Sequence, residues 1–169
     1  LVIVMNKVSS IQDYQDTSDN AIQCIPAKIK EINPIADVCI LEVPTIVQSN
    51  FILDSTDSVQ VGESIAVFGY PHSDHGRMVL TQQDTSIGAK ILIESSGIKL
   101  KNIVLNIQSR PGQSGSPIVI PEKRAIAGLL IGSYAPQVNG SISIGGIDPQ
   151  TLHQTTHAIS AEYIKEMLE

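Results

Sequence analysis

Several features are scarce in this sequence, and each shortage excludes a class of protein. Charged residues make up only 17% of the 169 residues and hydrophobic residues make up 42%, which argues against a disordered chain and indicates a real core. The net charge of −6 argues against nucleic acid as the main partner, because phosphate binding needs clustered Lys and Arg. No apolar run approaches the roughly 20 residues needed to cross a bilayer, so no membrane span is expected.

Cysteine and metal-ligand patterns are also scarce. Cys24 and Cys39 are the only cysteines, too few for a disulfide framework. Both fall in predicted strands, so we expect them to be small buried hydrophobic residues. His72 and His75 share one turn without a third ligand, which favours a solvated loop over a metal site. We therefore expect a soluble chain with no metal and no cofactor; compartment and oligomeric state are left open.

The dominant pattern is a series of short Ile- and Val-rich segments separated by Gly, Ser and Asp, which is typical of a β-sandwich or barrel. Lys28 with Lys30, and Lys99 with Lys101, alternate within such segments and predict solvated strand faces. One helix is expected at the end of the chain, with Ser160 as its N-cap. The length suits one domain, or one domain of two packed lobes. The predicted strands cover residues 1–5, 22–32, 38–43, 64–70, 78–82, 90–94, 98–106, 116–120, 125–133 and 141–144.

The most informative stretch is R-P-G-Q-S-G-S-P at residues 110–117. It places Ser114 at the tip of a glycine-flanked turn, directly before an apolar strand. Gly112 lets the backbone approach a reacting carbonyl, because it has no Cβ. The backbone N–H groups of Gly112 and Ser114 can then point at one spot and stabilise an oxyanion. A bare G-x-S sequence is more often a Gly/Ser-rich hairpin loop, so this turn alone does not identify a function.

The longer context resembles a known family. The turn is similar to the G-x-S-G-G/S-P signature around the nucleophile of trypsin-like (chymotrypsin-fold) serine proteases, and its surroundings are most similar to HtrA/Deg-type and related compact bacterial trypsin-like peptidases. Four other pieces follow in family order. Residues 36–43 resemble T-D-L-A-V-L-K-V, residues 62–71 resemble G-D-x-V-x-A-I-G-N-P, residues 125–132 resemble V-I-G-I-N, and residues 157–164 resemble F-A-I-P.

The resemblance implies an all-β fold with two antiparallel, six-stranded-type β-barrels and a C-terminal helix. The whole chain would form one peptidase domain. Residues 1–61 would form the first barrel, without the hairpin that the family places before Leu1. Residues 62–134 would form the second barrel, and residues 135–169 would supply a closing strand and the helix.

The resemblance also implies roles for individual residues. Ser114 would be the nucleophile, Asp37 would orient a histidine, and the N–H groups of Gly112 and Ser114 would form the oxyanion hole. The substrate pocket carries no charge, so it would prefer small or medium apolar side chains over Lys or Arg. The residues implied for this pocket are Gln108, Ser109, Ile131, Gly132 and Ser133.

One position departs from the family pattern. The family has its general base in a T-N-x-H-V segment, and the matching segment here is V-M-N-K-V, with Lys7 at the position of the histidine. All four histidines of the chain come after Asp37. Because a carboxylate stabilises an ammonium, we expect a Lys7–Asp37 ion pair to be structural rather than catalytic.

Two functional hypotheses follow. The first is a serine endopeptidase that hydrolyses peptide bonds through an acyl-enzyme on Ser114, with its histidine outside the given chain. The second is a catalytically silent pseudoprotease that acts as a peptide-binding or interaction module, with Lys7 at the position of the base. Both imply a polypeptide partner.

Overall fold

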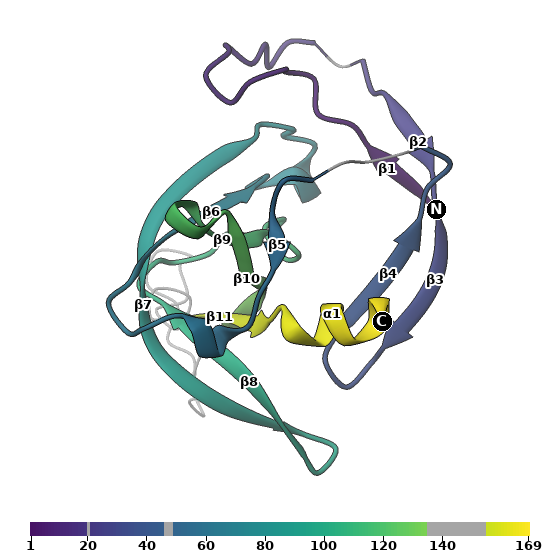
Figure 1. Cartoon of the computed structure of the whole chain (residues 1–169). Helices are drawn as coiled ribbons and strands as arrows, with labels where there is room; N and C mark the ends of the chain where they lie inside the picture. The colour runs from purple at the N-terminus through teal and green to yellow at the C-terminus, as the bar shows by residue number, and fades with distance from the viewer. Residues whose placement is uncertain (20, 46–48, 135–154) are drawn as a thin grey trace, which may run out of the picture.

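The computed structural model describes residues 1–19, 21–45, 49–134 and 155–169. The strand predicted at residues 141–144 lies outside this part of the chain. Within it, strands dominate, with one α-helix at the C-terminus (Figure 1). The elements are β1 (Val2–Val4), β2 (Cys24–Pro26), β3 (Lys28–Asn33), β4 (Val38–Glu42), β5 (Ile52–Leu53), η1 (Thr56–Ser58), β6 (Ser64–Gly69), η2 (Ser73–His75), β7 (Thr81–Ser95), β8 (Ile98–Leu105), β9 (Pro117–Ile120), η3 (Pro121–Lys123), β10 (Ala125–Tyr134), β11 (Thr155–Ser160) and α1 (Glu162–Leu168).

Six strands form the main body. They are hydrogen-bonded in the order β11-β8-β7-β6-β9-β10, and β10 also pairs with β11, so the pairings close into a ring. All six pairings of this ring are antiparallel. Side chains alternate between the two faces of each strand, and the inward set is aliphatic. Its fully buried members include Ile65, Ile87, Ile103 and Ile118. Five of these strands, β6 to β10, come from residues 62–134, the range predicted for the second barrel, and β11 comes from the predicted closing segment. The division of the chain into two barrels stays a prediction.

Strand β7 differs from the sequence prediction of two short strands. It is one strand of 15 residues, whose first part pairs with β6 and whose later part pairs with β8. The register with β8 shifts between Ile87 and Ala89, which marks a bulge at Gly88. A bulge bends a strand without ending it. The polar, glycine-containing middle of β7 therefore reads as a break in the sequence although the strand continues through it.

The N-terminal half consists of two antiparallel pairs, β1–β2 and β3–β4. One face of the β3–β4 pair is apolar, because Ile29 pairs with Leu41 and Ile32 pairs with Cys39. Ile29 is 56% exposed and Ile32 is 59% exposed, so no layer of the described chain covers this face. The open apolar face supports the expectation of further strands in this half, which stays a prediction.

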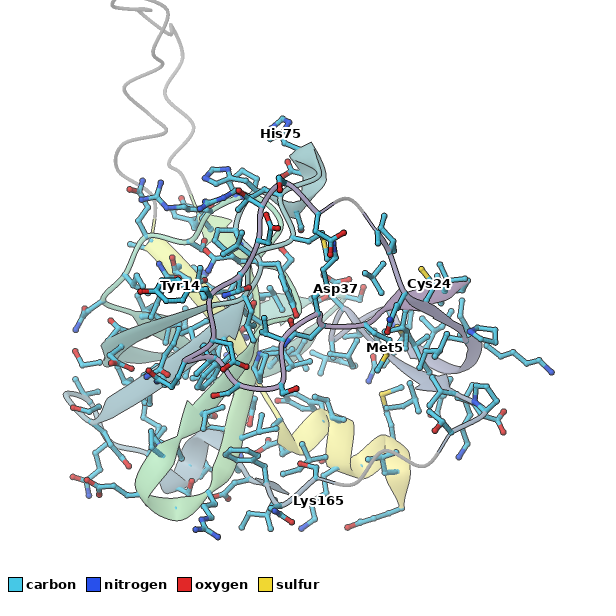
Figure 2. The ribbon with its side chains drawn as sticks, turned by 90° about the horizontal axis from the view of Figure 1, so that it is seen from above. Met5, Tyr14, Cys24, Asp37, His75 and Lys165 are labelled. Atoms are coloured by element: carbon cyan, nitrogen blue, oxygen red, sulfur yellow. The ribbon has the colours of Figure 1, made fainter. Side chains whose placement is uncertain are left out.

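The predicted burial of the cysteines is wrong. Cys24 and Cys39 are both free and exposed, and Figure 2 shows Cys24 at the surface of the N-terminal half. The reason is that both lie in two-stranded pairs, where an inward-facing position is buried only if a second layer packs over it.

Helix α1 connects the two halves (Figure 1). Its residues Tyr163, Ile164 and Met167 pack in one cluster with Ala36 and Val38 from the start of β4. This cluster fixes the β3–β4 hairpin against the main body.

The start of α1 and one lysine differ from expectation. The N-cap residue is Ala161, whereas the Ser160 hydroxyl accepts the Thr56 N–H at 3.0 Å, because Ser160 is still part of β11. Lys101 lies on a partly solvated strand face, with its side chain 40% exposed, but it also forms ion pairs that the sequence pattern does not indicate. Its Nζ lies 2.5 Å from the Asp57 carboxylate and 3.1 Å from that of Glu162, and so ties η1 and α1 to β8.

Candidate functional site

Two successive β-turns, residues 110–113 and 113–116, form the segment around Ser114, which lies in the second turn. The Gln113 N–H donates to the Arg110 carbonyl at 3.1 Å, and the Ser116 N–H donates to the Gln113 carbonyl at 3.0 Å. The third residue of each turn is a glycine with positive φ, +86° at Gly112 and +87° at Gly115. Such a φ is what a type II turn requires at this position. The pattern P-G-Q-S-G therefore encodes the backbone path that presents Ser114 at the surface.

The close packing around Gly112 also leaves no room for a side chain at this position. A Cβ at this position would lie 2.5 Å from Ser73 Oγ, 2.8 Å from the Ser73 nitrogen and 2.9 Å from the Tyr70 carbonyl oxygen. The His72 N–H donates to the Pro111 carbonyl at 2.7 Å, which holds the two segments together. The loop that carries η2 is thus packed directly against the serine turn.

Gln113 supports the turn from inside the protein, a role that no sequence motif indicates. It is fully buried. Its Oε1 accepts the Arg110 N–H at 2.8 Å, and its Nε2 donates to Gln83 Oε1 at 2.6 Å. Ser116 faces the core side of the turn, where a Cβ on Gly69 would lie 2.1 Å from its Oγ. The two serines of the motif therefore have different positions, Ser114 exposed and Ser116 buried.

Three groups of the turn have no hydrogen-bond partner among the described residues: the N–H of Gly112, the N–H of Ser114 and the Ser114 hydroxyl. In contrast, the Gly115 N–H donates to the Leu130 carbonyl at 2.7 Å, and the Leu130 N–H donates to the Ser116 carbonyl at 2.9 Å. The turn is therefore anchored to β10 at Leu130, while these three polar groups are not used by the described part of the chain.

Asp37 lies in the tight turn between β3 and β4, in left-handed backbone with φ +55°. It is exposed. The preceding residues Ile35 and Ala36 pack in one cluster with Leu129 and Ile131 of β10. Leu130, the residue between those two, anchors the serine turn. The turns that carry Asp37 and Ser114 are thus held by consecutive residues of the same strand.

The expected Lys7–Asp37 ion pair is not formed. Lys7 Nζ donates to the Asp19 carbonyl at 2.5 Å and lies 3.2 Å from the Asp19 carboxylate. The pKa of Asp19 is lowered, first by the Ala21 N–H and then by Lys7. The loop between β1 and β2 folds back and supplies its own carboxylate, so the lysine is paired within its own segment.

A cavity of about 260 Å³ lies between the N-terminal segment and residues 76–79. Lys7, Asp16 and Tyr70 are on its wall. Burial raises the pKa of the Tyr70 hydroxyl. Gln15 fixes one side of the cavity, because its amide donates to the Leu80 carbonyl and accepts the Leu80 N–H, at 2.8 and 2.7 Å. The carbonyl oxygen of Tyr70 would lie 2.9 Å from a Cβ on Gly112. Because Tyr70 lines the cavity, the cavity begins beside the serine turn.

The residues predicted to line the substrate pocket lie on both sides of the turn. The Ser109 N–H donates to the buried Thr156 Oγ1 at 2.8 Å, which joins the segment before the turn to β11. Gln108 and Ser133 are exposed, and Ile131 and Gly132 are half-buried. No sequence motif indicated this contact of Thr156 with the segment predicted to line the pocket.

The described histidines differ in their surroundings. His72 begins η2 in left-handed backbone, and His75 projects from the same turn into solvent (Figure 2). His157 lies on β11, and burial lowers the pKa of its imidazole. His153 lies outside the described residues. Within the described part of the chain, no three His, Cys, Asp or Glu side chains are grouped to hold a metal ion. No helix there is long and apolar enough to span a membrane.

No family model and no curated protein matches this sequence. Solved structures do match its fold. The active form of the Rv3671c protease from M. tuberculosis superposes with a TM-score of 0.62 at 18% identity, over 86% of this chain and 58% of that chain. An inactive form gives a TM-score of 0.60 over 64% of that chain. The MamO protease domain from Magnetospirillum magneticum gives 0.61 at 14% identity, over 90% of this chain and 72% of that one.

This chain therefore spans about 58% to 72% of the solved chains that it resembles. At sequence identities of 14–18%, these matches establish a similar fold and do not establish a function. The match is consistent with a chain made mostly of strands with one C-terminal helix. The chain has the chymotrypsin-like, all-β fold of trypsin-like serine protease domains.

Proposed function

We propose that this domain binds polypeptide segments at the Ser114 turn and that the described chain does not activate Ser114 for hydrolysis. The single observation that carries the proposal is the pairing of Lys7 with Asp19. The protease fold supports a polypeptide ligand, and the contacts of Lys7 argue against its use as a base.

The first support is the state of the turn. Its unpaired N–H groups at Gly112 and Ser114 are donors for a peptide carbonyl. Ser114 itself is exposed, so a ligand reaches it without displacing protein atoms. Successive turn N–H groups of this kind bind carbonyl oxygens whether or not a reaction follows.

The second support is the absence of an activating contact. A serine hydroxyl is a poor nucleophile unless a neighbouring base takes its proton. Lys7 could act as that base only as a neutral amine, which requires burial away from carboxylates. Instead, its Nζ lies 3.2 Å from the Asp19 carboxylate and forms an ion pair with it. Among the described residues no side chain hydrogen-bonds to Ser114 Oγ.

The pocket residues suggest what the ligand carries. Gln108, Ser109, Ile131, Gly132 and Ser133 are all uncharged, and the buried Thr156 is a neutral hydroxyl. A Lys or Arg side chain would leave its charge unpaired there, which is costly. The proposed ligand therefore places a small or medium apolar residue at this pocket.

A second candidate is a serine endopeptidase that forms an acyl-enzyme on Ser114. The complete serine turn favours it, together with the position of Asp37 on the hairpin held by β10. This candidate requires an imidazole from outside the described residues, oriented by Asp37. Removing one member of such a triad leaves only about 10³–10⁴-fold acceleration over water, so the two candidates differ widely in rate.

The test combines binding and cleavage in one sample. A library of ten-residue peptides with a central small apolar residue is incubated with the chain. Affinities are measured by fluorescence anisotropy, and peptide masses are recorded over a day. We expect binding in the micromolar range or weaker with every peptide mass unchanged.

Ser114→Trp should abolish binding, because a bulky side chain at the exposed tip fills the site without disturbing the core. Ser64→Trp is the matched control, since Ser64 is also exposed and lies five residues along β6 from Gly69, which touches Ser116. Binding that survives Ser114→Trp would refute the site. Peptide cleavage that is lost in Ser114→Ala would replace the proposal by the endopeptidase candidate.

A further inference from the structure

Strand β10 continues past the serine turn and carries an exposed aromatic pair. The turn is anchored at Leu130, and β10 runs on to Tyr134. Tyr134 is 59% exposed. Its ring is parallel to that of His157, with an interplanar angle of 4° and ring centroids 6.2 Å apart.

Strand pairing places these rings on one sheet face. Tyr134 pairs with Thr155, and Gly132 pairs with His157, so the two aromatic residues are diagonal neighbours. Thr155 Oγ1 lies 3.2 Å from His157 Nε2, which orients the imidazole. The space where a Gly132 side chain would stand is open, with no atom of the described residues within 4 Å of an ideal Cβ. The face thus offers two fixed rings beside an unfilled position.

The same face points toward the candidate site. Ile159 lies two residues after His157 on β11, so both side chains are on the same side of that strand. Ile159 packs in the cluster that contains Ala36, Leu129 and Ile131, next to the hairpin that carries Asp37. The aromatic pair is therefore on the side of the sheet that faces the N-terminal half.

We propose that Tyr134 and His157 form a subsite that holds an aromatic side chain of the bound peptide. This inference rests on the proposed peptide-binding function. None of Gly132, Tyr134, Thr155 and His157 carries a formal charge with the imidazole neutral, and the lowered pKa of His157 keeps it so near neutral pH. A planar apolar side chain matches such a surface, because offset stacking of rings is favourable beyond the area buried.

The distance along the strand sets the position of that side chain. Gly132 is two residues beyond Leu130 and Tyr134 is four, and a strand rises about 3.3 Å per residue. The subsite is thus roughly 7–13 Å from the anchor of the serine turn. An extended peptide covers this span in two to four residues.

Position-scanning peptides test the subsite. Each position within four residues of the central small residue is varied, and the affinity of the full chain is measured. We expect Phe, Tyr or Trp to be preferred at one position two to four residues away. Tyr134→Ala should reduce this preference roughly 3- to 10-fold, and Tyr134→Phe should keep it.

Phe51→Ala is the matched control, since Phe51 is also an exposed aromatic residue but precedes β5, which pairs with the opposite end of β10. A preferred charged residue at that position, or an aromatic preference unchanged in both Tyr134→Ala and His157→Ala, would overturn the subsite.

A second measurement does not depend on peptide binding at Ser114. Titration with p-cresol is followed by NMR of the histidine ring protons, with cyclohexanol as the non-aromatic control. Shifts of the His157 signals with p-cresol, and not with cyclohexanol, would support the subsite even if no peptide binds. A failure of the peptides to bind would then count against the proposed function and not against the subsite. Unchanged His157 signals, or equal shifts with cyclohexanol, would refute the subsite.

Discussion

Gly112→Ala should cost more than the same change at Gly115, although both glycines occupy equivalent turn positions. Their φ values are +86° and +87°, so each alanine has the same backbone strain of about 1–2 kcal/mol. A Cβ on Gly115 meets nothing within 4 Å. A Cβ on Gly112 would lie 2.8 Å from the Ser73 nitrogen and 2.9 Å from the Tyr70 oxygen, two atoms joined by a hydrogen bond of 3.2 Å.

Backbone atoms cannot rotate away as a side chain can, so the loop that carries η2 must shift. Overpacking of this kind costs about 1–3 kcal/mol. We expect Gly112→Ala to lower the free energy of unfolding by about 2–5 kcal/mol and Gly115→Ala by about 1–2 kcal/mol. The melting temperatures of the two variants should differ by roughly 2–12 °C.

The assay is urea unfolding of both variants, read by circular dichroism and checked by thermal melts. A Ser73→Ala background removes only the hydroxyl contact, so Gly112→Ala should remain the costlier change there. Equal losses in the two variants would refute the claim that the serine turn is packed against the loop of residues 70–76.

Two further predictions concern the support of the fold. Gln113→Ala should cost about 2–5 kcal/mol, because it leaves the Arg110 N–H and the Gln83 amide unpaired and opens a cavity; Gln82→Ala, at an exposed position, should stay within about 0.5 kcal/mol in the same urea titration. The pKa of Glu63 is held below its ordinary value of 4.5, mainly by the hydrogen bond from Lys123, so this carboxylate stabilises the fold above that pH and the contribution is lost as the pH falls through the lower, folded value. Stability measured between pH 6 and 3 should therefore fall less steeply in Lys123→Ala, and an unchanged slope would contradict the assignment.

Much of the fold follows from local sequence patterns. The ring of six strands arises from segments whose Ile and Val alternate or run continuously. The predicted bounds of β6, β8, β9 and β10 are close to the observed ones, whereas β7 was predicted as two strands and β11 was not among the predicted strands. The turn at Ser114 was also recognised, because P-G and S-G pairs specify type II turns by themselves. A local pattern is enough where the neighbouring residues determine the backbone.

The predictions that were wrong concern contacts between residues far apart in the sequence. Whether Cys24 and Cys39 are buried depends on a second layer over the N-terminal strands, which no local pattern reveals. The sequence predicts Ser160 as an N-cap, yet its hydroxyl accepts a hydrogen bond from the N–H of Thr56, 104 residues earlier. The predicted ion pair of Lys7 with Asp37 was wrong for the same reason. The loop between β1 and β2 folds back and places Asp19 beside Lys7.

The residues of the candidate site differ in how well the sequence predicts their roles. Gln113 and Thr156 support the turn through contacts with Gln83 and Ser109, and neither belongs to a motif. Ser114 and Gly112 do belong to one, so the sequence alone was enough to predict the centre of the candidate site. Its surroundings required the structure.

The most direct test of the account is the rate at which a fluorophosphonate probe labels Ser114. The rate is followed by intact mass at pH 7.5 for the chain itself, for Ser114→Ala and for Lys7→Ala. Because the Lys7 ammonium is paired with Asp19, the account predicts labelling of the unaltered chain at the background level of Ser114→Ala, and no gain or loss in Lys7→Ala. Rapid labelling of the unaltered chain that disappears in Ser114→Ala would show that the serine is activated and would contradict the account.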